Sequence, residues 1–134
     1  MKNKVFVIGL SGESVFLNVD EYHKNGETLH SKTFKSEVGG KGYNQVIALN
    51  KFGSDVFYLS SIGHDYYGEK CEEFLKQKNV NSLFVKKDLP TAFATILTNS
   101  HGENQVTVYD GATRLLDKKD VLKVEDEIKT SSVV

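Results

Sequence analysis

Runs of apolar residues that alternate with helical patterns constrain the fold of this chain more than any other feature. Residues 5–8 (Val-Phe-Val-Ile) end at Gly9, and a second run of buried type occupies residues 56–62. Such runs are typical of strands that are buried on both faces of a sheet. A helical pattern follows at residues 41–52, and another begins after Asp65, a residue suited to capping a helix. The alternation predicts an α/β fold with a mainly parallel sheet.

Each expected helix has a defined apolar stripe. In the first helix the spacing i, i+3, i+4, i+7 gives Gln45, Ala48, Leu49 and Phe52. In the second helix the stripe is Tyr67, Cys71, Phe74 and Leu75. A last helix is expected over about residues 117–129, with Val121, Val124 and Ile128 facing the core, and residues 131–134 resemble the start of another strand. A sheet of about three strands with an unpaired end exposes apolar edges, so we expect the chain to be part of a larger fold.

Two further regions have a β pattern but little burial. Residues 13–38 contain short stretches at 15–17 and 28–34, separated by the Asn25-Gly26 turn. Residues 91–98 and 105–109 alternate around a turn at 99–102 and predict a hairpin. Together these segments predict a small β layer outside the main sheet.

Composition and charge exclude several classes of function. The chain has 134 residues, 39% of them hydrophobic and 26% charged, which suits one globular domain. A net charge of -1 gives no electrostatic reason to expect nucleic acid or an anionic membrane as a partner. The apolar run at residues 5–10 is too short for a signal sequence or a membrane span, so we expect a cytoplasmic protein. Cys71 has no partner for a disulfide, and the four histidines lack ligand spacing, so no metal site is expected.

The glycine-rich segment at residues 39–44 (Gly-Gly-Lys-Gly-Tyr-Asn) is the strongest candidate for a binding site. Glycines allow backbone N–H groups to face a ligand, and the following helix N-terminus favours negative charge. The segment is not a Walker A loop, because Tyr43 stands where Ser or Thr is needed. It is not a dinucleotide fingerprint, because Gln45 stands where the third glycine is needed. Its spacing alone fits a structural turn as well as a binding loop.

The sequence of residues 38–45 (Val-Gly-Gly-Lys-Gly-Tyr-Asn-Gln) closely resembles the first signature of the ribokinase-like (PfkB-type) carbohydrate kinase family. Residues 25–28, 63–68 and 110–112 resemble other segments of that family, in the same order. The resemblance covers the whole chain. It implies a ribokinase-like fold, a partial doubly wound sheet with a small β lid formed by segments at about 13–38 and 91–109. Residues 1–134 would be the N-terminal part of the kinase domain.

The resemblance also implies a sugar-binding site. Its residues would be Gly39, Gly40, Lys41 and Asn44, with Lys41 and Asn44 donating hydrogen bonds to sugar hydroxyls. The family usually has an N-x-D pattern just after the first strand, whose carboxylate holds two hydroxyls. Gly12 and Ser14 stand at that pattern here, with Glu13 between them, so the sugar is contacted differently or is unusual.

The catalytic residues of the family are expected beyond residue 134. Its G-A-G-D motif, which supplies the base, is not found in this sequence, and its nucleotide site lies in the same C-terminal half. The resemblance therefore implies a carbohydrate kinase that transfers phosphoryl from ATP, with Mg²⁺, to a sugar hydroxyl. The fragment alone should be inactive and should hold no cofactor.

Two other functions compete with this one. The first is a non-catalytic module that binds sugar or associates with itself, with a possible homodimer through the β lid. The second, a flavin- or nucleotide-binding α/β domain, is disfavoured by the failed dinucleotide fingerprint.

Overall fold

The main sheet is parallel and has three strands. The computed structural model describes residues 3–134. Its strands β1 (Lys4–Ile8), β4 (Asp55–Ile62) and β5 (Asn81–Lys86) pair in the order β1-β4-β5, all in parallel register. The expectation of a parallel α/β sheet built from the two apolar runs is confirmed.

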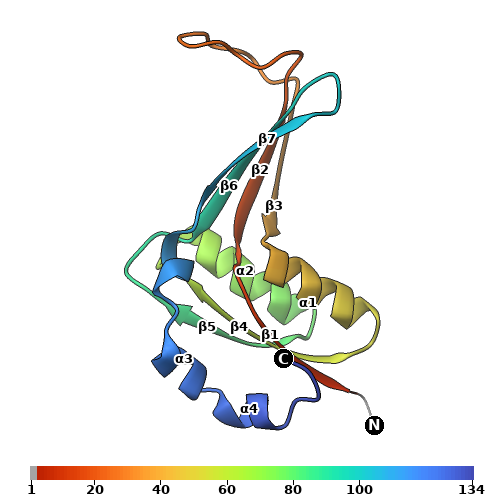
Figure 1. The fold of residues 1–134 in the computed structure, drawn as a ribbon, viewed down its shortest axis with the longest axis vertical. Coiled ribbons are helices and arrows are strands. Elements are labelled where there is room, and N and C mark those ends of the chain that lie inside the picture. Colours follow the sequence, from red (N-terminus) through yellow and green to blue (C-terminus); the bar gives the residue numbers. More distant parts are fainter. Residues whose placement is uncertain (1–2) are drawn as a thin grey trace.

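Helices cover both faces of this sheet (Figure 1). On one face, α1 (Lys41–Lys51) and α2 (Tyr66–Gln77) pack their buried residues against alternate residues of the strands. On the other face, α3 (Lys118–Leu122) and α4 (Glu125–Lys129) cover a smaller cluster that is centred on Phe6 and Leu59. Side chains on successive strand residues point to opposite faces, which explains why every second residue joins each cluster. The sheet is therefore doubly wound.

A second sheet, which we call the outer sheet, projects from one end of the core (Figure 1). Its strands are β2 (Gly12–Asn18), β3 (Thr33–Gly39), β6 (Ala92–Thr98) and β7 (Asn104–Tyr109), in the order β3-β2-β6-β7. The central pair β2–β6 is parallel and the outer pairs are antiparallel. The four strands lie within one residue of the segments 13–38 and 91–109. That this sheet acts as a lid stays a prediction.

The strand expected at residues 28–34 was misplaced. β3 begins at Thr33, opposite Asn18, and continues to Gly39, while residues 28–32 are exposed and belong to the loop after the Asn25-Gly26 turn. The stretch Lys35-Ser36-Glu37 lacks an apolar pattern because this part of the outer sheet faces water. The sequence therefore contains no alternating apolar pattern that would locate β3.

The last helix was expected to be continuous and is divided. Val124 has φ of -124°, outside the helical region, and separates α3 from α4. The expected core stripe is nevertheless correct, since Val121, Val124 and Ile128 all join the cluster on that face of the sheet. The break turns α4 so that Ile128 also reaches the strands.

The stripe expected on α1 was only partly correct, because Leu49 packs against the core cluster while Gln45, Ala48 and Phe52 are exposed. Tyr43 and Val46 are buried against the sheet instead, and the Phe52 side chain is 88% exposed. The helix is rotated so that Leu49 and Phe52 flank the open edge of β1, where Val133 forms a parallel bridge with Val5.

The start of α1 depends on one glycine. Gly40 precedes the helix with φ of 115°, a backbone conformation that residues with a Cβ atom rarely adopt. A Cβ atom there would lie 2.1 Å from the carbonyl oxygen of Leu10. Both observations require glycine at this position.

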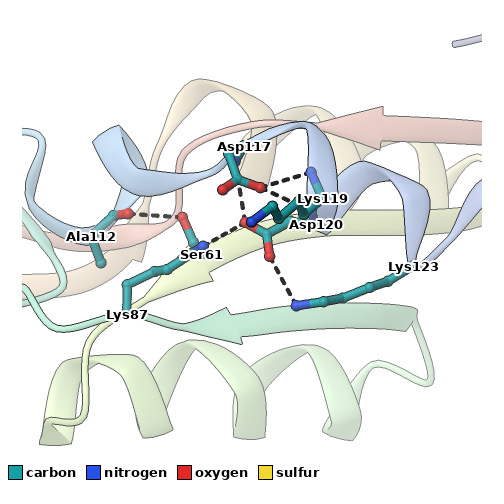
Figure 2. Close-up of polar contacts among 7 residues, drawn as sticks. All are labelled: Ser61, Lys87, Ala112, Asp117, Lys119, Asp120 and Lys123. Atoms are coloured by element: carbon teal, nitrogen blue, oxygen red, sulfur yellow. Dashed lines mark hydrogen bonds and ion pairs between the residues drawn. The ribbon is translucent and has the colours of Figure 1, made fainter.

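A buried carboxylate attaches α3 to the sheet (Figure 2). The Asp120 side chain is 3% exposed and lies 2.6 Å from Nζ of Lys87 and 2.9 Å from Nζ of Lys123. The Asp117 backbone N–H also donates to it, within a capping box. Burial alone would raise the pKa of Asp120, but the hydrogen bonds and charges of the two lysines outweigh burial and hold the pKa at about 2.

Within residues 3–134, no helix has the length and apolar character needed to cross a membrane.

We predict that Asp120→Asn lowers the free energy of unfolding at pH 7 by about 1–3 kcal/mol, because hydrogen bonds to a charged group are lost. The carboxylate has a lower pKa folded than unfolded, so its stabilisation is complete above about pH 4 and fades as pH falls towards 2. Urea unfolding at pH 7 and pH 2.5 should therefore give a smaller difference at the lower pH. Asp126→Asn, on the exposed side of α4, is the control. An equal difference at both pH values would contradict this role.

We also predict that Gly40→Ala lowers the free energy of unfolding by about 3 kcal/mol or more, because backbone strain and steric overlap add. Gly53→Ala is the matched control: Gly53 also has positive φ, 79°, but open space around its Cβ position. Its cost should be only about 1–2 kcal/mol. Urea unfolding of both variants measures the difference, and similar costs would argue against the contact with Leu10.

Candidate functional site

A pocket of about 490 Å³ lies between the base of the outer sheet and the N-terminus of α1. All six residues that the sequence predicted for sugar binding line it: Gly12, Ser14, Gly39, Gly40, Lys41 and Asn44. We call it the glycine pocket. The fold brings these residues together from the strands β2 and β3 and from the N-terminus of α1, and their role in binding stays a prediction.

Close backbone contacts shape the pocket wall. A Cβ atom on Gly12 would lie 2.2 Å from the carbonyl oxygen of Ala92, on the neighbouring strand β6. A Cβ atom on Gly39 would lie 2.7 Å from Oγ of Ser14. With this packing, no larger side chain fits at position 12 unless β6 moves away. The packing therefore accounts for glycine at position 12.

The floor of the pocket is electropositive. Lys41 is the first residue of α1, is exposed, and has no ion pair within residues 3–134. The first turn of α1 contains no acidic residue to offset the positive end of the helix dipole. The Asn44 backbone N–H donates to the Gly40 carbonyl oxygen at 2.8 Å, so the helical turn is already formed. Electron-rich oxygen atoms of a ligand would be favoured here.

Glu13 does not replace the missing carboxylate. Successive side chains of a strand alternate between faces, so Glu13 points away from the side that holds Ser14. Its carboxylate oxygens lie 2.6 and 2.9 Å from Nζ of Lys70 on α2, and it accepts a hydrogen bond from Ser36 of β3. The Glu13 residue is 2% exposed. It therefore attaches the outer sheet to α2.

This attachment could not be found from the sequence. Glu13 and Lys70 are 57 residues apart, and neither belongs to a pattern that predicts an ion pair.

A buried tyrosine holds the loop behind the pocket. The Tyr58 hydroxyl lies 2.9 Å from the Gly9 carbonyl oxygen and 3.0 Å from that of Leu10, and it accepts a hydrogen bond from Ser11. Burial raises the pKa of Tyr58 to about 12, so it stays a neutral donor at physiological pH. The link between β1 and β2 is thereby fixed.

The part of the pocket wall that β6 and β7 form is mostly apolar. It consists of outer-sheet side chains, with one carboxylate at the end: Ala94, Ile96, Val106, Val108 and Asp110.

No metal centre can be assigned here. Within residues 3–134 there is no group of three or more His, Cys, Asp or Glu side chains that could hold a metal ion. Two acidic residues line the pocket, but Glu13 directs its carboxylate to Lys70 on the other face of β2, which leaves Asp110. Within residues 3–134, the pocket therefore offers one carboxylate outside an ion pair and no cluster of metal-binding side chains.

The chain resembles known proteins along its whole length. The family model described as pfkB family carbohydrate kinase matches residues 2–134. The ribokinase of Dictyostelium discoideum is 32% identical over all of this chain, and that of Staphylococcus aureus is 33% identical. A ribokinase structure from Giardia lamblia has a TM-score of 0.89 with 23% identity, covering 99% of this chain and 40% of its own, and shows the shared fold.

The chain spans under half the length of these relatives, 43% and 45% of the two ribokinases. This coverage agrees with the expectation of a partial ribokinase-like fold. Because the family match extends over nearly every residue, the chain belongs to the pfkB family of carbohydrate kinases.

Proposed function

We propose that this chain is the sugar-binding part of a carbohydrate kinase that transfers a phosphoryl group from ATP to a sugar hydroxyl. The observation that carries the proposal is the convergence of the six predicted residues on the glycine pocket. Membership of a family of carbohydrate kinases supports it, and the two ribokinases make D-ribose the first sugar to test.

The chemistry of the pocket suits a polyhydroxylated ligand. Lys41 and the Asn44 amide can donate hydrogen bonds to hydroxyl oxygens, and the backbone at Gly39 allows close approach. The apolar side chains of Ile96 and Val108 can cover the carbon atoms of a sugar ring and exclude water. Phosphoryl transfer depends on positioning and electrostatic stabilisation, and a site of this kind supplies the positioning of the acceptor.

The proposal assigns catalysis to residues outside this chain. In a full-length kinase of this family, ATP with Mg²⁺ would supply the phosphoryl group, and a base outside residues 1–134 would accept the hydroxyl proton. The absence of a G-A-G-D motif from the sequence supports this assignment. A cytoplasmic location, where ATP is available, is part of the same proposal.

The alternative is a non-catalytic module that associates with itself through the outer sheet. The exposed apolar side chains of Val106 and Val108 on β7 favour it, at 53% and 52% exposure. Phe93 is not available for such a contact, since its ring packs 5.6 Å from that of Tyr67 on α2.

Kinase activity can be tested with a chimera in which this chain replaces the matching segment of the Staphylococcus aureus ribokinase. We expect ATP turnover with D-ribose by the chimera and none by the 134-residue chain alone, because the chain lacks the catalytic base. A coupled ATPase assay measures both, and Lys41→Met in the chimera should reduce kcat/KM by at least about tenfold through loss of a charged hydrogen-bond donor.

Two results would contradict the proposal. Turnover by the chain alone would place the base within residues 1–134. A folded chimera that binds ribose without turnover would favour the non-catalytic module.

Self-association predicts that Val106→Lys shifts the chain to monomer, because a buried lysine in an apolar contact is costly. Thr107→Lys is the matched control, since Thr107 is the next residue of β7 and faces the opposite side of the outer sheet. Sedimentation velocity at several concentrations measures the oligomeric state. A wild-type chain that stays monomeric, or a dimer that both variants preserve, would exclude this contact.

A further inference from the structure

We propose that Asp110 is a substrate-binding residue of the glycine pocket, and that its carboxylate accepts hydrogen bonds from hydroxyls of the acceptor. The inference rests on the proposed function, because it assigns the acceptor's partner within the same pocket. Asp110 directly follows β7 and lines the pocket together with Lys41 and Asn44.

The Asp110 side chain has no structural task in the fold. Asp110 stands at the N-cap of the 3-10 helix η1 (Gly111–Leu115), where aspartate usually accepts a backbone N–H. Here the side chain makes no capping hydrogen bond, and it forms no ion pair with any residue between 3 and 134. The residue is exposed at the pocket. An uncommitted carboxylate is thus available to a ligand.

The backbone holds Asp110 in place although its side chain is free. The Ala112 N–H donates to the Pro90 carbonyl oxygen at 2.8 Å. Gly111 has φ of 52°, and a Cβ atom there would lie 2.2 Å from the same oxygen, so this turn needs glycine. The Thr113 N–H donates to the Asp110 carbonyl oxygen at 3.2 Å. These contacts fix the backbone from which the Asp110 carboxylate extends, and they require no contact to the carboxylate itself.

The register of the outer sheet places the end of β7 beside the pocket. Val108 pairs with Ala94, which pairs with Ser14 on the other side. β7 ends at Tyr109, and Asp110 has helical backbone angles, with φ of -69° and ψ of -26°. Its place at the pocket is given by the pocket lining, in which it stands with Val108 and Ser14. The carboxylate and the α1 N-terminus with Lys41 both face the pocket.

Charge and hydrogen-bonding capacity favour the assignment. Two acidic residues line the pocket, and the Glu13 carboxylate is buried on the other face of β2 and paired with Lys70. Asp110 therefore has the pocket's one carboxylate that is not already in an ion pair within residues 3–134. A sugar hydroxyl is a donor as well as an acceptor, and Lys41 can only donate. The Asp110 carboxylate supplies negatively charged acceptor atoms, whereas the Ser14 hydroxyl is a neutral acceptor.

The test is calorimetric titration of the 134-residue chain with D-ribose, comparing wild type, Asp110→Asn and Asp126→Asn. Asparagine keeps the shape of aspartate and removes its charge. We expect Asp110→Asn to weaken Kd by about tenfold to a hundredfold, the usual effect of losing hydrogen bonds to a charged group. Asp126→Asn makes the same chemical change on exposed α4 and should leave Kd within about twofold.

A second readout separates ligand contact from a structural effect. Wild type should bind at least one of 2-deoxyribose and 5-deoxyribose more weakly than ribose, because that analogue lacks a hydroxyl that donates to Asp110. In Asp110→Asn the ratio of the Kd for that analogue to the Kd for ribose should be smaller, because ribose has also lost its charged acceptor. Unchanged discrimination in the variant would overturn the inference.

The remaining outcomes are distinct. If wild type binds ribose and Asp110→Asn binds it equally well, the inference is overturned while the proposed function stands. If the wild-type chain binds none of these sugars, the proposed function fails, and the inference fails with it.

Discussion

Close contact between glycine backbones is the constraint on which the rest of this structure depends. A Cβ atom on Gly42, in the first turn of α1, would lie 2.7 Å from Cα of Gly9 at the end of β1. The same loop passes Gly40, whose Cβ position is occupied by the Leu10 carbonyl oxygen. Because no side chain separates these segments, the N-terminus of α1 lies directly beside the start of β2. The glycine pocket exists because two sheets and one helix terminus meet at this point.

Two buried carboxylates then attach the peripheral elements to the core. Glu13 connects β2 to α2 through Lys70, and Asp120 connects α3 to the sheet through Lys87. Each is buried, and breaking such a pair leaves an uncompensated charge, which costs more than the pair itself contributes. The first pair has a direct consequence for function, because it sets how the outer sheet stands over the pocket. A rigid base for this sheet keeps Ser14 and Asp110 on one side of the ligand space and Lys41 on the other.

Much of this arrangement follows from sequence patterns, and the exceptions have physical causes. Apolar runs predicted β1 and β4, and Asp65 was correctly expected as a cap, since its side chain accepts from the Gly68 N–H at 2.9 Å. The resemblance named six pocket residues that the fold does bring together. The rotation of α1 was not predictable, because its stripe and its buried face differ by one residue and only tertiary packing selects between them. The Glu13–Lys70 pair and the position of Asp110 depend on contacts between distant segments, which no local pattern records.

The central claim is that the glycine pocket is where the sugar binds. Backbone amide chemical shifts of the ¹⁵N-labelled chain during titration with D-ribose test it most directly. Each residue with a backbone N–H, which excludes only Pro90 among residues 3–134, gives a signal that depends on its own surroundings. The account predicts shifts that are largest at residues 39–44 and at Ser14, with saturable dependence on ribose. It would be contradicted by saturable shifts confined to the broad groove between α2 and β5, which is lined by Glu73 and Gln77 among others.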